Sequence, residues 1–298
     1  MKEPVKLTIN NEEYYFINID RDNPKYRHSF NNLTRKTYGF DFEEWYQQGY
    51  WSDKYLPYSL LHNDEVVANV SANTIDFLFD GKLLHTVQIG TVMTEEAYRK
   101  KGLSKLLINK IIEEYEGQCD LMYLYANDTV LEFYTKYGFV EAEEYSYLRQ
   151  FVKRENRLSS RKLDMKSSRD KQIITRLVAA TRPVSKISMI GNSGLDMFCL
   201  ISFMSNDIYY IEELDLAVVV DFDGDNMFFM DVFCEQEFDL DEVINSLMNK
   251  AAMKVTLGFT PLDSALYTCE ILKEEGTTFF IRGKNTIEKG RFPILSHA

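Results

Sequence analysis

The spacing of apolar residues in the first part of the chain switches between the two-residue period of strands and the longer period of helices. Residues 6–20 show strand spacing on both sides of Asn10 and Asn11, which predicts two strands and a tight turn. Apolar and aromatic residues at helical spacing predict one or two helices over residues 24–49. An antiparallel meander is then predicted by three runs with strand spacing, which two-residue turns separate: residues 56–62, 66–79 and 82–94.

The period changes again within residues 86–105, where β-forming residues meet the start of an amphipathic helix. We expect this helix over residues 102–116, followed by a short buried strand at 119–126 that is parallel to the strand before the helix. A second helix at 127–138 and a closing strand at 141–152 complete this half. The order of strand, helix and strand predicts a right-handed crossover.

The second half repeats this order of elements. We expect a helix near residues 172–181, and then strands and a crossover helix in a similar sequence: strands at 197–203, 209–222 and 226–233, a helix at 239–250 and a strand at 255–259. A length of 298 residues fits about two domains. We therefore predict one domain at residues 1–152, a polar linker at 153–170 and a second domain at 171–298, each of them a mixed, mostly antiparallel sheet flanked by helices (α+β or α/β class).

Composition and charge narrow the class of protein. The chain is 45% hydrophobic and 27% charged, as in globular proteins. A net charge of −12 disfavours nucleic acid as a partner and makes amines or other cations easier partners. The sequence has neither an apolar N-terminal signal core nor a run of 18 apolar residues, so we expect a cytoplasmic protein without membrane association. The oligomeric state stays open.

Metal and disulfide chemistry are not indicated. The four cysteines stand far apart, without a Cys-x-x-Cys pair, and the four histidines lack the spacing of metal ligands. The acidic run at residues 221–225 lacks the glycine and glutamate positions of a calcium loop and is better explained as a hairpin turn. We therefore predict no bound metal.

The start of the helix at residue 102 has the features of an anion site. The first N–H groups of a helix have no partner within the helix, and the helix dipole adds positive charge at that end. Gly102 allows a ligand to approach the backbone closely. Cationic side chains surround it at Arg99, Lys100, Lys101 and Lys105. This stretch is therefore predicted to bind a phosphate or pyrophosphate group.

Two motifs resemble those of the GNAT superfamily of N-acetyltransferases. Arg99-x-x-Gly102-x-Ser104, after a strand and before a helix, is similar to the loop that holds the acetyl-CoA pyrophosphate, with Ser104 as a small departure from glycine or alanine. The second motif lies in residues 127–139, where these residues match and Val130 replaces an alanine: Asn127, Phe133, Tyr134, Gly138 and Phe139. The two motifs stand in the family's order.

The resemblance implies a tandem protein with an N-terminal catalytic domain and a degenerate C-terminal domain. It implies direct acetyl transfer from acetyl-CoA to a primary amine, with Tyr134 as the acid that protonates the leaving thiolate. The alternative for Tyr134 is packing on the core. The residues that would hold acetyl-CoA are Val92, Met93, Thr94, Arg99, Lys100, Lys101, Gly102, Leu103, Ser104, Lys105, Asn127 and Phe133. In the second half the loop at 235–239 is acidic, so one acetyl-CoA site is expected.

The base and the acceptor are less defined. Glu95 and Glu96 follow the central strand, Gln88 is able only to orient a water, and the carboxylate of Ala298 is a candidate because residues 291–298 are apolar enough to be tucked in. Two interpretations fit the aromatic residues Trp45, Tyr46, Tyr50 and Trp51. They line an acceptor pocket, or they pack in the core or in a lid. The acceptor is predicted to be a small-molecule amine. A non-catalytic acyl-CoA-binding module and a scaffold without ligand are the rival functions.

Overall fold

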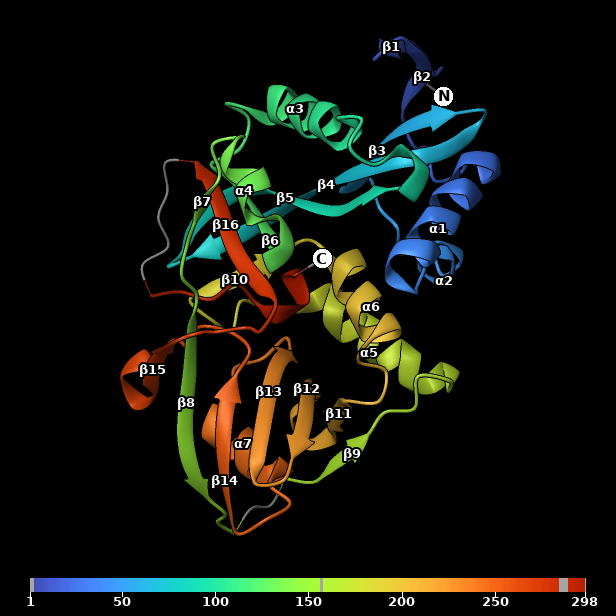
Figure 1. Ribbon diagram of the computed structural model, residues 1–298. Helices are drawn as coiled ribbons and strands as arrows, with labels where there is room; N and C mark the ends of the chain where they lie inside the picture. Colours follow the sequence, from blue (N-terminus) through green and yellow to red (C-terminus); the bar gives the residue numbers. More distant parts are fainter. Residues whose placement is uncertain (1–2, 156–157, 284–288, 298) are drawn as a thin grey trace.

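The computed structural model describes residues 3–155, 158–283 and 289–297. Its strands form two sheets, one above the other in Figure 1, and helices cover both. In the described residues the first sheet has nine strands and the second has seven. Neighbouring strands are antiparallel except for one parallel pair in each sheet. The predicted class, two mixed and mostly antiparallel sheets with flanking helices, is confirmed.

The first sheet contains the predicted meander. Its order is β1-β2-β3-β4-β5-β6-β16-β7, with β10 beside β4. Asn10 and Asn11 make the first turn with φ values of 50° and 65°, a left-handed conformation that asparagine adopts more easily than most residues. The strands are β1 Val5–Ile9, β2 Glu12–Asn18, β3 Tyr55–His62, β4 Glu65–Phe79, β5 Lys82–Thr94, β6 Leu121–Asn127, β7 Val140–Glu141, β10 Ile187–Ile190 and β16 Thr277–Gly283.

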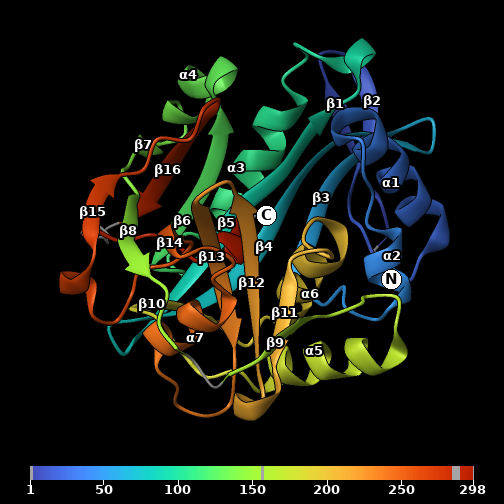
Figure 2. The same cartoon turned by 90° about the horizontal axis from the view of Figure 1, so that it is seen from below.

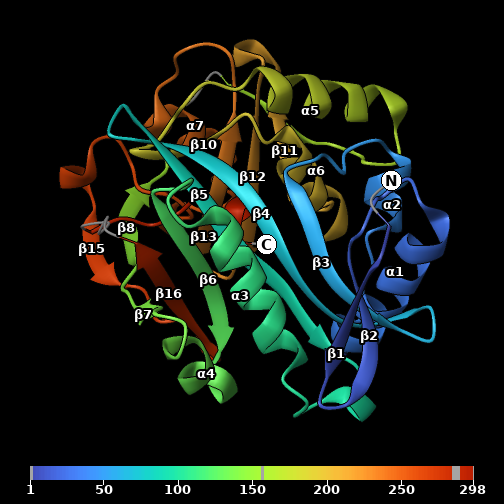
Figure 3. The same cartoon turned by 90° about the horizontal axis from the view of Figure 1, so that it is seen from above.

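The helices of this half are α1 Pro24–Tyr38, α2 Glu43–Gln47, α3 Leu103–Tyr115 and α4 Leu131–Thr135. Helix α3 connects β5 to the parallel strand β6, as predicted, and Figure 3 shows it lying across the sheet. Its buried face includes Leu107 and Ile111. The helix expected at 127–138 is shorter than predicted, since a 3₁₀ turn at Asp128–Val130 precedes α4.

The second sheet has the order β15-β8-β14-β13-β12-β11-β9 (Figure 2). The predicted hairpin, crossover helix and parallel strand are confirmed, because β12 pairs with β13 and, after α7, β14 runs parallel to β13. The strands are β8 Tyr145–Val152, β9 Ser160–Lys162, β11 Ile208–Ile211, β12 Leu216–Asp223, β13 Asn226–Phe233, β14 Ala252–Leu257 and β15 Thr268–Ile271. The helices are α5 Ser168–Ala180, α6 Ser193–Ser202 and α7 Leu240–Leu247.

One prediction for the second half is wrong. The run at 197–203 is helix α6 and not a strand, and all residues from Leu195 to Leu200 are buried. A helix that is apolar on every side shows no helical period, so it is easily mistaken for a buried strand. The expected linker contains strand β9, which pairs with β11 at the edge of the second sheet.

The closing strand predicted at 141–152 is also wrong as a strand of the first half. Only β7 stays in the first sheet, and β8 crosses into the second sheet, where it lies between β14 and β15. In return, β15 is followed by β16, which lies between β6 and β7 of the first sheet (Figure 1). Each sheet is thus completed by a strand from the other half. The sequence division at residue 152 stays a prediction, but the sheets do not divide there.

The last described residues pack between the two sheets. Phe292 is 1% exposed, and its ring centre lies 4.7 Å from that of Tyr123 and 4.6 Å from that of Phe77. The Ile294 amide donates to the carbonyl of Gly258 in the second half at 3.1 Å. The predicted burial of this segment is confirmed up to His297, whereas Ala298 lies outside the described residues.

Candidate active site

Strands β5 and β6 pair over a short stretch and then separate. Their parallel register runs up to Gln88 opposite Tyr123, and the described residues form no further pair between these strands. On its other side β5 stays bound to β4, but the ladder is irregular beside Asn69. Thr91 lies at this bulge with φ of 49°, and its carbonyl accepts a hydrogen bond of 2.9 Å from the Asn69 side chain. A bulge bends a strand, and here it accompanies the opening between β5 and β6.

A cavity of about 1020 Å³ occupies this opening. Residues from the end of β5, the start of α3, the region of α4, the end of α1 and the end of α6 line it. All of the residues predicted to hold acetyl-CoA or to act on it line this cavity, with Lys101 as the exception: Val92, Met93, Thr94, Arg99, Lys100, Gly102, Leu103, Ser104, Lys105, Asn127, Phe133 and Tyr134.

The start of α3 leaves its backbone donors available. Gly102 is the N-cap residue with φ of 80°, and no side chain caps the helix. Unpaired N–H groups and the positive end of the helix dipole therefore face the same region as the side chains of Arg99, Lys100 and Lys105. The hydroxyl groups of Thr94 and Ser104, 2.8 Å apart, join β5 to the first helical turn.

Lys101 holds the loop from outside the cavity. Its ammonium group lies 2.8 Å and 2.9 Å from the two carboxylate oxygens of Glu12 and 5.2 Å from the centre of the Tyr98 ring. The hydrogen bond from Lys101 lowers the pKa of the Glu12 carboxyl. The Asn10 side chain also donates to the Lys101 carbonyl at 3.0 Å. The hairpin of β1 and β2 thus fixes the loop before α3.

Tyr134 of α4 lies in another wall of the cavity. It is 6% exposed, and its ring packs against Phe133, Phe139 and Phe280 with centres 5.2 Å, 6.4 Å and 6.1 Å away. Burial raises the pKa of its phenol well above the ordinary value, because the phenolate would lose its solvation, and the nearby Tyr38 phenol raises it further. At neutral pH Tyr134 is a protonated phenol, as an unshifted phenol would also be, and its hydroxyl lies in the wall of the cavity.

The lining contributed by α1, the loop after it and α6 is mostly aromatic. The ring centres of Phe40 and Phe203 lie 5.3 Å apart, those of Phe198 and Phe203 lie 5.5 Å apart, and Tyr38 stacks on Phe40 at 5.9 Å. The Tyr38 hydroxyl donates to the carbonyl of Val92 in β5 at 3.0 Å, and burial raises its pKa to about 12. This aromatic wall is attached directly to the open edge of β5.

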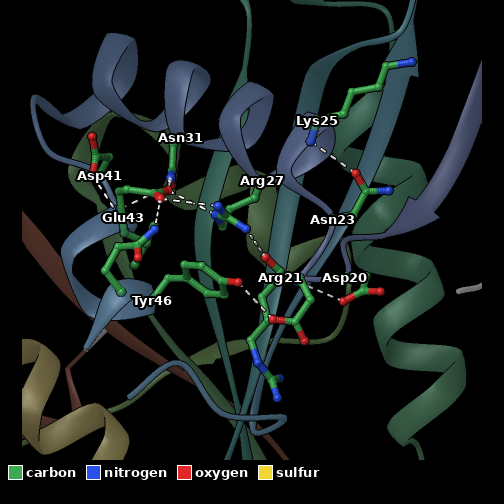
Figure 4. Close-up of polar contacts among 12 residues, drawn as sticks. Asp20, Arg21, Asn23, Lys25, Arg27, Asn31, Asp41, Glu43 and Tyr46 are labelled. Atoms are coloured by element: carbon green, nitrogen blue, oxygen red, sulfur yellow. Dashed lines mark hydrogen bonds and ion pairs between the residues drawn. The ribbon is translucent and has the colours of Figure 1, made fainter. Parts of the chain in front are cut away.

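A buried polar network fixes the loop that carries Phe40 (Figure 4). The Arg27 guanidinium, in a residue that is 5% exposed, donates to the Glu43 carboxylate at 3.1 Å. The Asn31 amide group donates to the same carboxylate at 2.9 Å, and its oxygen accepts from the Phe42 N–H at 3.2 Å. These bonds tie the start of α2 to α1, so the intervening loop has a defined path.

The tryptophans expected near the acceptor belong to the core instead. Trp45 and Trp51 are each 3% exposed and stack at 5.5 Å. Tyr46 lies 3.8 Å beneath the Arg27 guanidinium, and the Tyr50 hydroxyl lies 2.9 Å from that of Thr175. None of these residues is among the described residues that line the cavity; the two tryptophans belong to the core, and Tyr46 and Tyr50 are partly buried against it.

The candidate bases do not line the described cavity either. Glu95 is engaged by Lys36 at 2.7 Å, and this hydrogen bond lowers the pKa of its carboxyl. Gln88 is fully buried, and its side-chain oxygen lies 3.5 Å from the Asn73 amide nitrogen. Glu96 also lies outside the lining, and Ala298 lies outside the described residues.

Tyr125 and His297 line the cavity and had not been predicted. The Tyr125 hydroxyl lies 2.7 Å from Nε2 of His297, and the two rings stack at 4.0 Å. Burial, together with the charge of Arg291, lowers the pKa of His297 to about 3, so its imidazole is neutral. These residues meet through tertiary contacts between distant segments, as do Tyr38, Phe40, Phe198 and Phe203. No local motif indicates them.

The second half has a different cavity beside the start of α7. Its volume is about 550 Å³, and the acidic residues among its lining are Glu237, Asp239, Asp241 and Asp263. The Asp239 carboxylate caps α7 by accepting from the N–H groups of Asp241 at 2.8 Å and Glu242 at 3.2 Å. The cations at this helix start, Arg182 and Arg149, are already paired with Glu237 and Asp241, and the Asp239 side chain occupies the first N–H donors of the helix.

Metal and membrane features were also searched for over the described part of the chain. There, no set of three or more His, Cys, Asp or Glu side chains is arranged to hold a metal ion. None of the helices described in residues 3–297 combines the length and the apolar character needed to cross a membrane.

Comparison with known proteins places this geometry in a family context. Residues 19–142 match the family model of the acetyltransferase (GNAT) domain. Among curated protein sequences, none matches the chain. The match to the GNAT domain includes β5, the loop before α3, and α4, which together line most of the cavity.

Solved structures with a similar fold extend over both sheets. A conserved protein of unknown function and probable N-acyltransferase from Enterococcus faecalis is 13% identical with a TM-score of 0.58, covering 90% of this chain and 72% of its own. A GCN5-related N-acetyltransferase from Kribbella flavida is 16% identical with a TM-score of 0.54, and the match covers 90% of this chain and 70% of that protein. Eis1 from Mycobacterium abscessus is 13% identical with a TM-score of 0.55, and the match covers 89% of this chain and 72% of that protein. At these identities the likeness concerns the fold.

Proposed function

Residues 19–142 form a domain of the GNAT acetyltransferase family, and from this premise we propose that the protein transfers an acetyl group from acetyl-CoA to a primary amine of a small molecule. The family itself supports acyl transfer in general. The observation that carries the finer proposal is a single cavity that joins an uncapped, cationic helix start to a buried, protonated tyrosine.

The residues present fit the chemical groups of acetyl-CoA. The pyrophosphate would accept hydrogen bonds from the free N–H groups at Gly102–Lys105, with Arg99 and Lys100 supplying positive charge. The pantetheine arm contains amide groups, and the backbone of β5 from Val92 to Thr94 lines the cavity where β6 no longer pairs with it. An extended amide chain is able to bond to such an open strand edge.

The reaction requires one new bond and the loss of another. The neutral amine nitrogen attacks the thioester carbonyl carbon, an N–C bond forms, the C–S bond breaks, and the nitrogen loses a proton. Backbone N–H groups at the end of β5 would stabilise the negative charge on the carbonyl oxygen. The leaving thiolate takes a proton from the Tyr134 hydroxyl, water accepts the proton that the nitrogen loses, and the Tyr134 phenolate regains a proton from water. Because only the neutral amine attacks, the rate is expected to rise with pH as the amine deprotonates.

The rival function, a module that binds acyl-CoA without transferring the acyl group, would need only the helix start. It does not explain a buried phenol in the wall of the same cavity. This observation favours the enzyme.

The test is thiol release from acetyl-CoA with a panel of amines, using the purified chain and a Tyr134→Phe variant. We expect the variant to lower kcat by about 10–100-fold while the KM for acetyl-CoA stays unchanged, since the substitution removes a proton donor and leaves the binding loop intact. Tyr145→Phe is the matched control, because this tyrosine bonds to Glu143 and neither residue is among the described residues that line the cavity. Unchanged turnover in Tyr134→Phe would remove the acid role. Saturable acetyl-CoA binding without thiol release for any amine would favour the binding module.

A further inference from the structure

One part of the cavity wall comes from segments outside the proposed acetyl-CoA motifs: α1, the loop after it, and the end of α6. Its lining consists of Thr37, Tyr38, Phe40, Phe198 and Phe203. Among the described residues, no Asp or Glu lines any part of this cavity. We propose that the acceptor is a monoamine with an aromatic or similarly flat apolar body, and not a polyamine or an aminoglycoside. This inference rests on the proposed function and specifies its acceptor.

The aromatic wall offers both ring faces and ring edges. Phe203 meets Phe40 and Phe198 edge to face, with interplanar angles of 89° in both pairs, whereas Tyr38 and Phe40 are stacked at 26°. Phe203 is 54% exposed, so much of its surface is free to contact a ligand. Aromatic ligands prefer such edge-to-face and offset contacts, and burying an exposed ring also gains hydrophobic free energy.

The wall is held in place before a ligand arrives. Phe198 is 5% exposed and stacks on Phe42 at 5.0 Å, and the network of Arg27 and Glu43 fixes the start of α2. Rigid walls lose little conformational freedom on binding, which favours a ligand whose shape matches them.

Charge argues against an acceptor with several ammonium groups. A single ammonium is able to lie against aromatic faces, and it loses its proton in the reaction. Every further ammonium would keep its charge and would need a carboxylate partner in the cavity. The acids near the end of α1 already have partners, since Asp41 pairs with Arg35 at 2.6 Å and Glu95 pairs with Lys36 at 2.7 Å. The cations of the cavity would oppose extra positive charge until the phosphates of acetyl-CoA neutralise them.

The wall also gives the second half of the chain a role. Phe198 belongs to α6 and Phe203 is its C-cap residue, in a run that sequence patterns alone misassign to a strand. The first half would supply the acetyl-CoA site, and the second half would complete the acceptor site. Selectivity for the acceptor is therefore expected to respond to α6 while affinity for acetyl-CoA does not.

The closing experiment measures binding apart from transfer. Isothermal titration calorimetry on the full chain saturated with CoA would compare 2-phenylethylamine, 2-cyclohexylethylamine, ethylamine, spermidine and neamine. We expect 2-phenylethylamine to bind at least tenfold more tightly than ethylamine, spermidine or neamine, with 2-cyclohexylethylamine between. Phe203→Ala is expected to lower the 2-phenylethylamine affinity about tenfold and to leave CoA affinity unchanged.

Leu266→Ala is the matched control for Phe203→Ala, because Leu266 is also an apolar side chain with 53% exposure and it lines the other cavity. A Phe203→Glu variant adds the missing carboxylate and should raise spermidine affinity. Tighter or equal binding of spermidine or neamine by the unmodified chain, or an unaffected Phe203→Ala, would overturn the inference. Selective binding of 2-phenylethylamine without thiol release would sink the proposed transfer and leave this inference standing. Thiol release with spermidine as the preferred amine would support the proposed transfer and overturn the inference about the acceptor.

Discussion

Helices α3 and α7 occupy the same place in the two halves, yet they begin in opposite ways. Each follows the second strand of an antiparallel pair and leads to a strand parallel to it. Helix α3 begins at Gly102, which has no side chain to offer, whereas Asp239 caps α7 with its own carboxylate. One backbone arrangement thus leaves its donors for a ligand, and the other satisfies them internally. The contrast shows that the N-cap residue decides whether the first N–H groups of these two helices are bonded by a side chain.

The space beyond the parallel strands differs as well. In the first half β5 and β6 separate around the larger cavity. In the second half the Gly258 amide donates to the Phe229 carbonyl at 2.8 Å, and a Cβ atom on Gly258 would lie only 2.6 Å from the Met230 carbonyl oxygen. Ile294 of the C-terminal segment bonds to the carbonyl of Gly258. The equivalent opening is therefore closed by close strand contact and by the chain's own end.

The sharpest way to break this contrast is to give α3 the cap of α7. In a Gly102→Asp variant the new carboxylate would repel phosphate and accept the N–H groups that the phosphate needs. If two charged hydrogen bonds of about 1.5 kcal/mol each are lost, the KM for acetyl-CoA should rise about 100-fold. Steady-state kinetics or calorimetry with acetyl-CoA would measure this rise.

Gly117→Asp is the matched control, since Gly117 at the other end of α3 has φ of 79° and, like Gly102, nothing within 4 Å of an added Cβ atom. Both variants carry the same backbone strain. An equal loss of affinity in the two variants would show that the strain, and not the lost anion site, is responsible.

A second prediction concerns the segment where the chain passes from the first sheet to the second. Glu144 lies there with 5% exposure, and burial raises its pKa from 4.5 to about 7. Between these pH values the folded chain keeps a proton that the unfolded chain has lost. The free energy of unfolding should therefore decrease as pH rises from about 4.5 to 7, by about 3 kcal/mol for this group. A Glu144→Gln variant should lack this decrease and should be more stable than the unmodified chain at pH 8.

Urea unfolding of both proteins at several pH values measures the difference between them. The lowered pKa of His297 makes stability rise with pH between about 3 and 6.5, and because its Nε2 lies 3.9 Å from a Glu144 carboxylate oxygen, the difference removes only the part of this contribution that does not depend on Glu144. Glu143→Gln, at the exposed neighbouring position, is the control. A pH-independent difference between Glu144→Gln and the unmodified chain would contradict the expected shift.

A smaller effect is expected from removing the cap of α7. Asp239→Ala should lower the free energy of unfolding by about 1 kcal/mol, because two backbone N–H groups lose their acceptor. Chemical denaturation measures it, and the KM for acetyl-CoA should not change. Asp263→Ala is the control, since Asp263 lines the same cavity and precedes a 3₁₀ turn without capping it. An equal decrease in the free energy of unfolding in the two variants would show that the Asp239 cap does not stabilise the protein.

The smallest expected effect tests whether the charge of the loop before α7, or the closed opening at Gly258, prevents acetyl-CoA binding in the second half. Glu237→Lys combined with Asp241→Lys makes the second loop cationic, and adding Gly102→Asp disables the first site. We expect no stabilisation by acetyl-CoA in a thermal shift assay, because the strand contact at Gly258 and the Asp239 cap both remain. A clear rise in melting temperature with acetyl-CoA would mean that charge alone decides between the two loops.

Local patterns predicted the meander, the crossover helix of each half and most of the acetyl-CoA loop. These features depend on residues close in sequence, such as Asn10 and Asn11 in the first turn and the cations around Gly102. The candidate roles of Tyr134 and its neighbours came from motif resemblance, and they stay proposals although these residues line the cavity. Helix α6 was missed because residues 197–201 form an unbroken apolar run without a helical period.

The sequence by itself determined most of the elements, with helix α6 as an exception, and the charge at each helix start, because near neighbours set the backbone propensities and the local field. Only the tertiary structure decided that β8 and β16 change sheets, since an apolar strand fits any open edge and its sequence does not name a partner. The same applies to the aromatic wall, where α1 and α6 meet from positions about 160 residues apart. The proposed acetyl-CoA loop thus depends on residues close in sequence, whereas the proposed acceptor site exists only in the folded protein.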